Sequence, residues 1–61
     1  MNYETYEVRV YENGGKFWYL NGKYHRVDGP AVEYVDGDKE WWLNDKRMTE
    51  QKWLIEREKY L

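Results

Sequence analysis

The sequence predicts a mainly β fold of the α+β class: an antiparallel meander of repeated β-hairpins, with about five or six strands, closed by one C-terminal α-helix. Two observations support this prediction. Residues 11–23 and 34–46 are two copies of one pattern, with seven of thirteen positions identical at an offset of 23 residues. Self-similarity at a period of about 20 to 50 residues is typical of repeat architectures. The second observation is a helical spacing of apolar residues, which replaces strand-like alternation after Thr49.

The first expected strand spans residues 3–11, where Tyr6, Val8 and Val10 share one face and two charged residues take the other. Alternation of this kind indicates a half-buried strand. An Asn-Gly-Gly turn separates it from a second expected strand at 16–20, which is rich in aromatic residues.

Asn21-Gly22, between two apolar runs, is a strong hairpin signal, because a type I′ turn needs positive φ at both central positions. A return strand is expected at 23–27. Asp-Gly-Pro at 28–30 then interrupts the ladder, since proline lacks an N–H group and is excluded from central strands. The next strand is expected at 31–35.

The second copy repeats these signals, with a turn at Asp36-Gly37, an aromatic strand at 39–43 and a hairpin turn at Asn44-Asp45. Asp45 stands where the first copy has glycine, and this difference predicts a looser second turn. The two copies are therefore expected to form similar hairpins that differ in this turn.

A terminal helix is expected at about 50–60, with Thr49 as its N-cap, because a threonine hydroxyl can accept hydrogen bonds from the free N–H groups of the first turn. Such a helix would cover the last apolar face of the repeat, as atypical terminal elements do in repeat proteins. The side expected to face the sheet consists of Trp53, Leu54, Arg57 and Leu61.

Length and composition restrict the alternatives. With 61 residues, the chain is expected to be a single domain over 1–61, with repeat copies at 11–33 and 34–48. There is no cysteine and a single histidine, which argues against disulfides and structural zinc. Aromatic residues make up 20% of the chain, so a thin sheet is expected to leave some of them on a contact surface.

Charge and hydropathy lead to an expectation about where the protein acts. The net charge is −2 and charges of both signs are interleaved, so no tail for nucleic acid or anionic membrane stands out. The sequence has neither an apolar run of about 18 residues nor a signal-peptide pattern at its beginning. It is therefore expected to be a full-length cytoplasmic protein that does not associate with membranes.

Residues 18–34 read WYLNGKYHRVDGPAVEY. This segment resembles a repeat of small proteins from large tailed phages and some bacteria, in which an aromatic pair precedes Leu-Asn-Gly-Lys and then x-His-Arg-x-Asp-Gly-Pro-Ala. The 23-residue period and the Tyr, Trp and Gly content are also similar to MORN-type β-hairpin repeats. The resemblance covers residues 11–61, but Arg47-Met48 replaces the His-Arg-x-Asp-Gly-Pro continuation in the second copy. The chain therefore resembles a minimal member, for which a long solenoid role is in doubt.

His25, Arg26 and Asp28 come closest to a polar cluster. His25 could act as a general acid or base oriented by Asp28. In the resembling family, however, this string recurs in tandem, and a catalytic site is rarely duplicated within one small domain. We therefore favour a structural role, in which His25 or Asp28 ties the loop before Pro30 to backbone groups. The residues expected to shape the hairpin turn and this loop are Asn21, Gly22, His25, Asp28, Gly29 and Pro30.

No nucleophile with an adjacent base and no metal-ligand cluster is recognisable in the sequence. The chain contains neither serine nor cysteine, and Asp36 and Asp38 are not followed by the oxygen ligands of a calcium loop. The sequence therefore predicts a protein that is not an enzyme, with no catalytic residue, metal or cofactor.

The aromatic strands predict a core and a contact surface on opposite faces of the sheet. The core is expected to contain Trp18, Leu20, Trp41 and Leu43, which the repeat places on one face. The opposite face is expected to bind a protein partner, because Tyr, Trp and Arg are enriched in binding hot spots. The residues predicted for this contact surface are Phe17, Tyr19, Tyr24, Arg26 and Trp42. The sequence leaves open whether the helix, a second subunit or a ligand covers it.

The predicted function is non-catalytic protein binding. The resemblance implies a phage-encoded accessory protein in the host-cell cytoplasm, which binds and inhibits a bacterial host or defence protein. Two alternatives stay open: sequestration of a nucleotide-type ligand between aromatic faces, with Arg26 or Lys23 at the phosphate, and a homo-oligomeric structural protein. Net acidity argues against single-stranded nucleic acid, despite the lysines beside the aromatic strands.

Overall fold

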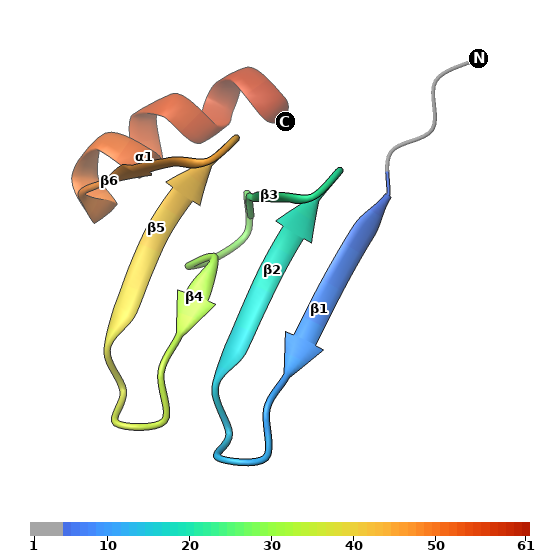
Figure 1. Cartoon of the computed structure of the whole chain (residues 1–61). Coiled ribbons are helices and arrows are strands. Elements are labelled where there is room, and N and C mark those ends of the chain that lie inside the picture. The colour runs from blue at the N-terminus through green and yellow to red at the C-terminus, as the bar shows by residue number, and fades with distance from the viewer. Residues whose placement is uncertain (1–4) are drawn as a thin grey trace.

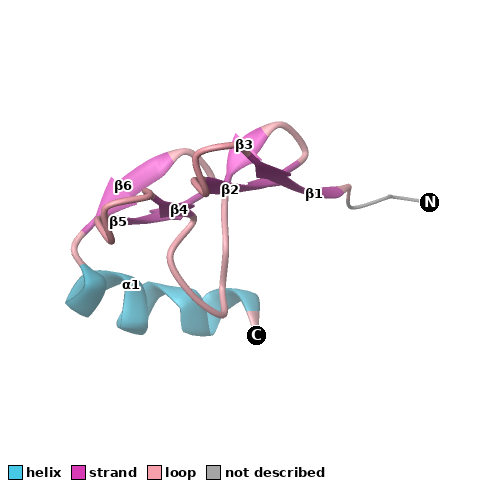
Figure 2. Ribbon diagram, turned by 90° about the horizontal axis from the view of Figure 1, so that it is seen from below, coloured by secondary structure: helices cyan, strands magenta, loops and turns pink. Residues whose placement is uncertain are grey.

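The structure is a computed structural model that describes residues 5–61. Within that range the chain forms a six-stranded antiparallel sheet with a helical segment against one face (Figures 1 and 2), so the predicted fold class is confirmed. The elements are β1 (Tyr6–Val10), β2 (Lys16–Leu20), β3 (Lys23–Tyr24), β4 (Val32–Glu33), β5 (Lys39–Leu43), β6 (Lys46–Met48), the helix α1 (Glu50–Glu56) and the 3-10 helix η1 (Arg57–Tyr60).

One strand position in the middle of the sheet is filled by two short strands. The strand order is β1-β2-β4-β5-β6, and because β1 takes one edge of β2 over its whole length, β3 and β4 share the other edge. Between them, the Trp18 carbonyl accepts a hydrogen bond from the His25 N–H at 3.2 Å, and the Trp18 N–H donates to the Ala31 carbonyl at 2.8 Å. Residues 26–30, which we call the β3–β4 loop, leave the sheet between these two bonds towards the helix (Figure 2).

β3 and β4 are both shorter than the strands that the sequence predicted for them, and that expectation is wrong. The reason lies in the backbone hydrogen bonds of the loop. The carbonyls of Arg26 and Val27 accept hydrogen bonds from the side chains of Trp53 and Arg57, each at 2.8 Å. The loop is therefore bonded to the helical segment at positions where a continuous strand would be bonded to its neighbours.

The two repeat copies form the same turn between their strands. The Gly14 N–H donates to the Tyr11 carbonyl at 2.8 Å, and the Gly37 N–H donates to the Tyr34 carbonyl at 3.0 Å. The two glycines have φ of 93° and 95°, a region where a side chain would be strained. In each copy an Asn or Asp side chain also accepts a hydrogen bond from the N–H two residues further on, at 2.9 and 3.0 Å.

Both hairpin turns have positive φ at two successive residues, as a type I′ turn requires. The φ angles are 53° and 79° at Asn21 and Gly22, and 50° and 66° at Asn44 and Asp45. The expectation of a looser second turn is wrong, because Asp45 is held from two sides. Its Oδ1 accepts from the Tyr24 N–H at 2.7 Å, and its N–H donates to the Tyr24 carbonyl at 2.9 Å.

The helical segment starts at its predicted cap, where the Thr49 hydroxyl accepts a hydrogen bond from the Lys52 N–H at 3.2 Å. The α-helix ends earlier than expected and tightens into η1. Trp53 is the buried side chain of α1, whereas Leu54 and Leu61 are 47% and 70% exposed. The expectation for these two leucines is wrong. Leu54 lies about 100° around the helix from the buried Trp53, and Leu61 follows the end of η1 at Tyr60.

The core is small. Of the predicted core residues, Leu20 and Leu43 are buried, whereas Trp18 and Trp41 are half-buried. The Trp41 ring packs against Trp53 of α1, with ring centroids 4.5 Å apart. The buried apolar residues among residues 5–61 are Leu20, Pro30, Ala31, Val32, Leu43 and Trp53.

β1 differs from the rest of the sheet because all of its residues are exposed. The observed strand is shorter than the one expected at 3–11, of which residues 3 and 4 lie outside the described part of the chain. The expectation of a half-buried strand is wrong because α1 packs on β5, near the opposite edge of the sheet, and does not extend over β1 (Figure 2). Tyr6, Val8 and Val10 are therefore 62%, 49% and 64% exposed.

Candidate protein-binding face

Four aromatic side chains lie together on the sheet face that points away from α1. Trp41 contacts Trp53 of the helix, so its strand neighbour Trp42 points to the opposite face. The cross-strand register places Tyr19 opposite Tyr24 in the sheet, on the same face as Phe17. We call Phe17, Tyr19, Tyr24 and Trp42 the aromatic face.

Tyr24 is the centre of the aromatic face. Its ring stacks on Tyr19 with centroids 4.9 Å apart and an interplanar angle of 27°. It also contacts Trp42 at 5.0 Å and Phe17 at 6.2 Å. Such pairs contribute about 0.5–1.5 kcal/mol each beyond the area they bury. All four rings are half-buried, so they hold one another in place while each keeps an accessible surface.

A shallow hollow of about 280 Å³ opens at the Phe17 end of this face. Tyr11 and Tyr34, which are equivalent positions of the two copies, pack edge-on against the Phe17 ring at 5.1 and 6.0 Å. Gly15 also lines the hollow, and a Cβ there would lie 3.3 Å from the Asn13 side-chain oxygen, so a side chain would crowd the turn at this point. The sequence interpretation did not include Tyr11 and Tyr34, although their equivalence in the repeat was a usable signal.

Glu40 supplies a fixed negative charge beside the aromatic face. Its carboxylate accepts hydrogen bonds from the Tyr34 hydroxyl and from Trp42 Nε1, each at 2.9 Å. The hydrogen bond from the hydroxyl to this carboxylate raises the pKa of Tyr34. Glu40 was also missing from the predicted set, because the first copy has phenylalanine at this position.

Arg9 and Glu7 border the opposite end of the face. They form an ion pair on β1, and the Arg9 guanidinium lies 4.7 Å from the centre of the Tyr19 ring. A side-chain hydrogen bond with Tyr24, with a smaller contribution from burial, raises the pKa of Tyr19. The aromatic face is therefore flanked by charged groups at both ends.

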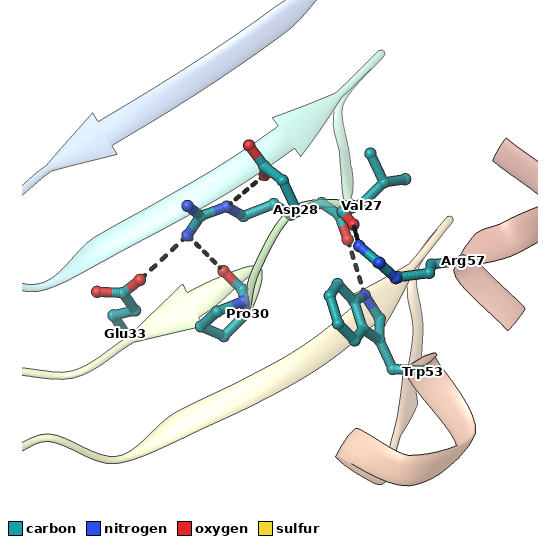
Figure 3. Close-up of polar contacts among 7 residues, drawn as sticks. Val27, Asp28, Pro30, Glu33, Trp53 and Arg57 are labelled. Atoms are coloured by element: carbon teal, nitrogen blue, oxygen red, sulfur yellow. Dashed lines mark hydrogen bonds and ion pairs between the residues drawn. The ribbon is translucent and has the colours of Figure 1, made fainter. Parts of the chain in front are cut away.

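Arg26 does not belong to this surface, and its predicted place there is wrong. The chain leaves the sheet after His25, so strand alternation no longer sets the direction of the Arg26 side chain. The Arg26 guanidinium lies 3.8 Å from the centre of the Trp18 ring, on the helix side of the sheet. It donates to Asp28 at 2.8 Å and to Glu33 at 3.0 Å (Figure 3).

Arg26 instead closes the β3–β4 loop. Its Nη1 also donates to the Pro30 carbonyl at 3.1 Å, which links the beginning of the loop to its end. A Cβ on Gly29 would lie 2.7 Å from Arg26 Cζ, so the arginine occupies the space that a side chain would need there. The hydrogen bond from Arg26 holds the pKa of Asp28 below its ordinary value.

The cations that the nucleotide alternative required do not lie on the aromatic face. Arg26 is engaged by two carboxylates on the helix side. Lys23 pairs with Leu20 across the hairpin, which places its side chain on the helix side as well. This geometry disfavours a phosphate held beside the aromatic rings.

His25 is buried and joins the two repeat copies. Its Nδ1 accepts a hydrogen bond from the Asn44 N–H at 3.1 Å, and its ring packs edge-on against Tyr60 at 4.9 Å. Nδ1 is therefore the unprotonated nitrogen in this arrangement. Asn21 has a comparable role at the hairpin turn, since its Oδ1 accepts from the Thr5 N–H at 3.0 Å.

A second hollow, of about 620 Å³, lies between β6 and the helical segment. Basic groups predominate along it, although Lys59 is already paired with Glu56 at 2.7 Å. The sequence interpretation missed this groove because the residues come from two separate elements. The residues that line it are Leu43, Lys46, Arg47, Met48, Lys52, Glu56, Lys59 and Tyr60.

The fold and this surface define a small domain rich in β-hairpins and aromatic residues. No protein-family model, no curated protein and no solved structure matches the chain. Within residues 5–61, no helix is both long and apolar enough to cross a bilayer. In the same range, no three His, Asp or Glu side chains are grouped in a way that could hold a metal ion.

Proposed function

We propose that the protein is a non-catalytic binding module that contacts a protein partner through its aromatic face. The observation that carries this proposal is the position of the helical segment. Because α1 packs on the Trp41 side of the sheet, it does not cover Tyr19, Tyr24 or Trp42. Tyrosine and tryptophan are the side chains that most often dominate the energetics of protein interfaces.

The rings are already ordered in the unbound protein. Tyr24 contacts three other rings, and the Trp42 indole donates to Glu40. Side chains that are already ordered lose little conformational entropy on binding, which otherwise costs about 0.5–1.5 kcal/mol for each immobilised side chain. The charges of Arg9 and Glu40 beside the rings correspond to the polar rim of a typical interface.

The hollow at Phe17 supports a more specific arrangement. With a volume of about 280 Å³ and walls formed largely by Tyr11, Phe17, Tyr34 and Val35, it is large enough for one apolar side chain of a partner. A partner that inserts such a side chain would contact the stacked rings with the neighbouring part of its surface.

The biological setting that we propose rests on the resemblance alone. It is that of a phage-encoded accessory protein whose partner is a bacterial host protein, with inhibition of a host or defence protein as the outcome. The partner class and the aromatic face can be tested independently of this setting.

The test is affinity capture with purified protein and bacterial lysate. Tyr19→Ala and Trp42→Ala should abolish capture of any partner that the unaltered protein retains, whereas Ile55→Ala should not, because Ile55 is 71% exposed on the helix. Thermal melts establish that all variants are folded. Capture that survives both aromatic substitutions would contradict the proposal.

The nucleotide alternative has its own measurement. Four tryptophans report stacking of a base through a change in fluorescence. An unchanged emission spectrum on titration with nucleotides is the expected result, and a saturable change that Trp42→Ala removes would favour the alternative instead.

A further inference from the structure

β1 forms one edge of the sheet, and no strand within residues 5–61 pairs with its outer side (Figure 1). Each residue of β1 is exposed. Natural proteins commonly protect such edges with lysine, proline, a bulge or a covering element, because a free edge pairs readily with another strand. The sequence of β1, YEVRV, has no lysine or proline, its two charges are of opposite sign, and its residues pair with β2 in an uninterrupted register.

The hydrogen bonds at the two ends of β1 show which backbone groups point outward. The Asn21 N–H donates to the Thr5 carbonyl at 2.9 Å, and the Tyr11 N–H donates to the Gly15 carbonyl at 2.9 Å. In an antiparallel ladder, alternate residues direct their N–H and C=O groups to opposite edges. Odd-numbered residues of this strand therefore bond β2, and the backbone groups of Val8 and Val10 point to the outer edge.

The two faces of β1 carry different side chains, apolar on one face and charged on the other. Val8 and Val10 are exposed on the helix side of the sheet. Glu7 and Arg9 lie on the side of the aromatic face, with about half of each side chain exposed. Charges of opposite sign thus flank Val8 at equal distances along the strand.

We propose that β1 pairs antiparallel with β1 of a second copy of this chain, around a two-fold axis at Val8. In this register Val8 faces Val8 of the second copy and exchanges both backbone hydrogen bonds with it. Glu7 faces Arg9 of the second copy, and Arg9 faces its Glu7. A two-fold axis makes every contact occur twice, so the two opposite-charge pairs form together.

Other two-fold registers of the same two strands are less favourable. An axis at Glu7 places two carboxylates opposite each other, and an axis at Arg9 places two guanidinium groups opposite each other. Like charges at directly opposed positions of a sheet are destabilising. An axis at Tyr6 or Val10 leaves most of the strand without a partner. Of these registers, the Val8 register alone pairs both charges of β1 with their opposites.

This pairing would continue the sheet from one copy into the other. Because the axis stands perpendicular to the sheet, the aromatic faces of the two copies lie on the same side of it. Tyr19 is the cross-strand neighbour of Glu7, so the two stacked clusters lie near the junction. A dimeric or repetitive partner could then bind both clusters at once. Its overall affinity would exceed that for one cluster, because the second binding event is intramolecular.

The pairing is expected to be reversible. An edge of five residues buries much less than the roughly 800 Å² per partner of a standard stable interface. The dimer should therefore form as protein concentration rises, and it should weaken with salt because two opposite-charge pairs take part in it.

Charge reversal tests the register. Sedimentation equilibrium of the unaltered protein at increasing concentration should show a monomer–dimer equilibrium. Glu7→Arg and Arg9→Glu should each weaken the dimer by about tenfold or more, because each places like charges opposite one another twice. An equimolar mixture of these two variants should dimerise again, since one chain then presents two carboxylates and the other two cations. A mixture that stays monomeric, or single variants that dimerise like the unaltered protein, would overturn the proposal, as would a strictly monomeric unaltered protein at millimolar concentration.

Proline substitution tests the direction of the backbone groups. Val8→Pro removes an N–H that points outward, and proline is tolerated on edge strands in this orientation. The variant should remain folded and be monomeric. Arg9→Pro removes an N–H that bonds β2 and should lower the thermal midpoint instead. If Val8→Pro stays folded and dimerises like the unaltered protein, the dimer does not form through β1 and the proposal fails.

Discussion

The two repeat copies have the same turns but different surroundings. The turn of each copy closes through a glycine with nearly the same φ, and each aromatic strand spans five residues. The strand of the second copy, β5, lies against α1, whereas the strand of the first copy, β2, lies beside the exposed β1. The comparison shows that the repeated residues determine the hairpins, whose aromatic strands are buried to the same extent, and that segments outside the repeat give the two hairpins different neighbours.

Removal of the Trp53 side chain, which joins the helical segment to both copies, should lower the stability of the protein most. The ring is buried against Trp41 and donates to the Arg26 carbonyl, so it joins the helical segment to both copies. Trp53→Ala should lower the free energy of unfolding by about 3–5 kcal/mol. Urea denaturation, followed by circular dichroism, measures this free energy of unfolding. Ile55→Ala, on the exposed side of the same helix, is the matched control and should change the value by less than about 0.5 kcal/mol.

His25→Ala should have the next largest effect, because it breaks the bond between the copies. The part-buried Asn44 N–H loses its acceptor, which costs at most the roughly 1–3 kcal/mol of a fully buried group without a partner. His25→Asn restores a side-chain acceptor and should recover part of the loss. Equal destabilisation by the two substitutions would mean that ring packing against Tyr60, and not the hydrogen bond, accounts for the role of His25.

Substitution of the two turn glycines shows whether the same change costs the same stability in each copy. Gly14→Ala and Gly37→Ala each force a side chain into positive φ, which costs about 1–2 kcal/mol. The two losses should agree within about 0.5 kcal/mol, since neither Cβ would meet an atom closer than 3.7 Å. Chemical denaturation of both single variants tests this. A clear inequality would show that the copies are energetically distinct at their turns.

The smallest expected effect concerns Asp28 and pH. Its pKa is lowered in the folded state, chiefly by the hydrogen bond from Arg26, so its contribution to stability is present above the unfolded pKa of about 3.9. This contribution is lost as pH falls through the lower folded pKa. Asp28→Asn should therefore be slightly less stable than the unaltered protein at pH 7 and indistinguishable from it near pH 2. Because this side chain is 81% exposed, the difference at pH 7 should be small. Thermal midpoints of the two proteins between pH 7 and about pH 2 measure this difference in stability. A difference that grows as the pH falls would contradict the lowered pKa of Asp28.

Local patterns in the sequence predicted the regular parts of the fold well. The strands at 16–20 and 39–43 were predicted with their observed bounds, and the Asn-Gly turn and the Thr49 cap follow from the chemistry of single residues. Each of these features depends on residues that are close in the chain, so a short segment contains the information.

Features that depend on distant segments were predicted poorly. The exposure of β1 follows from the position of α1 on β5, which strand alternation does not encode. Arg26 was assigned to the wrong face because alternation was extended past the point where the chain leaves the sheet. Asp45 adopts its turn conformation because the backbone of Tyr24, from the other copy, bonds it on both sides. In these cases a tertiary contact overrides the local pattern.

The β3–β4 loop explains how such a short chain fixes the position of a second layer. α1 buries Trp53 and presents mostly polar or exposed side chains elsewhere, so apolar contact alone would let the helix slide or rotate across the sheet. The two loop carbonyls act as fixed docking points, because each accepts a directional bond from a different turn of the helical segment. These two hydrogen bonds together fix both the position and the rotation of the helical segment on the sheet. Orientation in this protein is therefore specified by hydrogen-bond geometry, where a larger domain would specify it by the shape of its core.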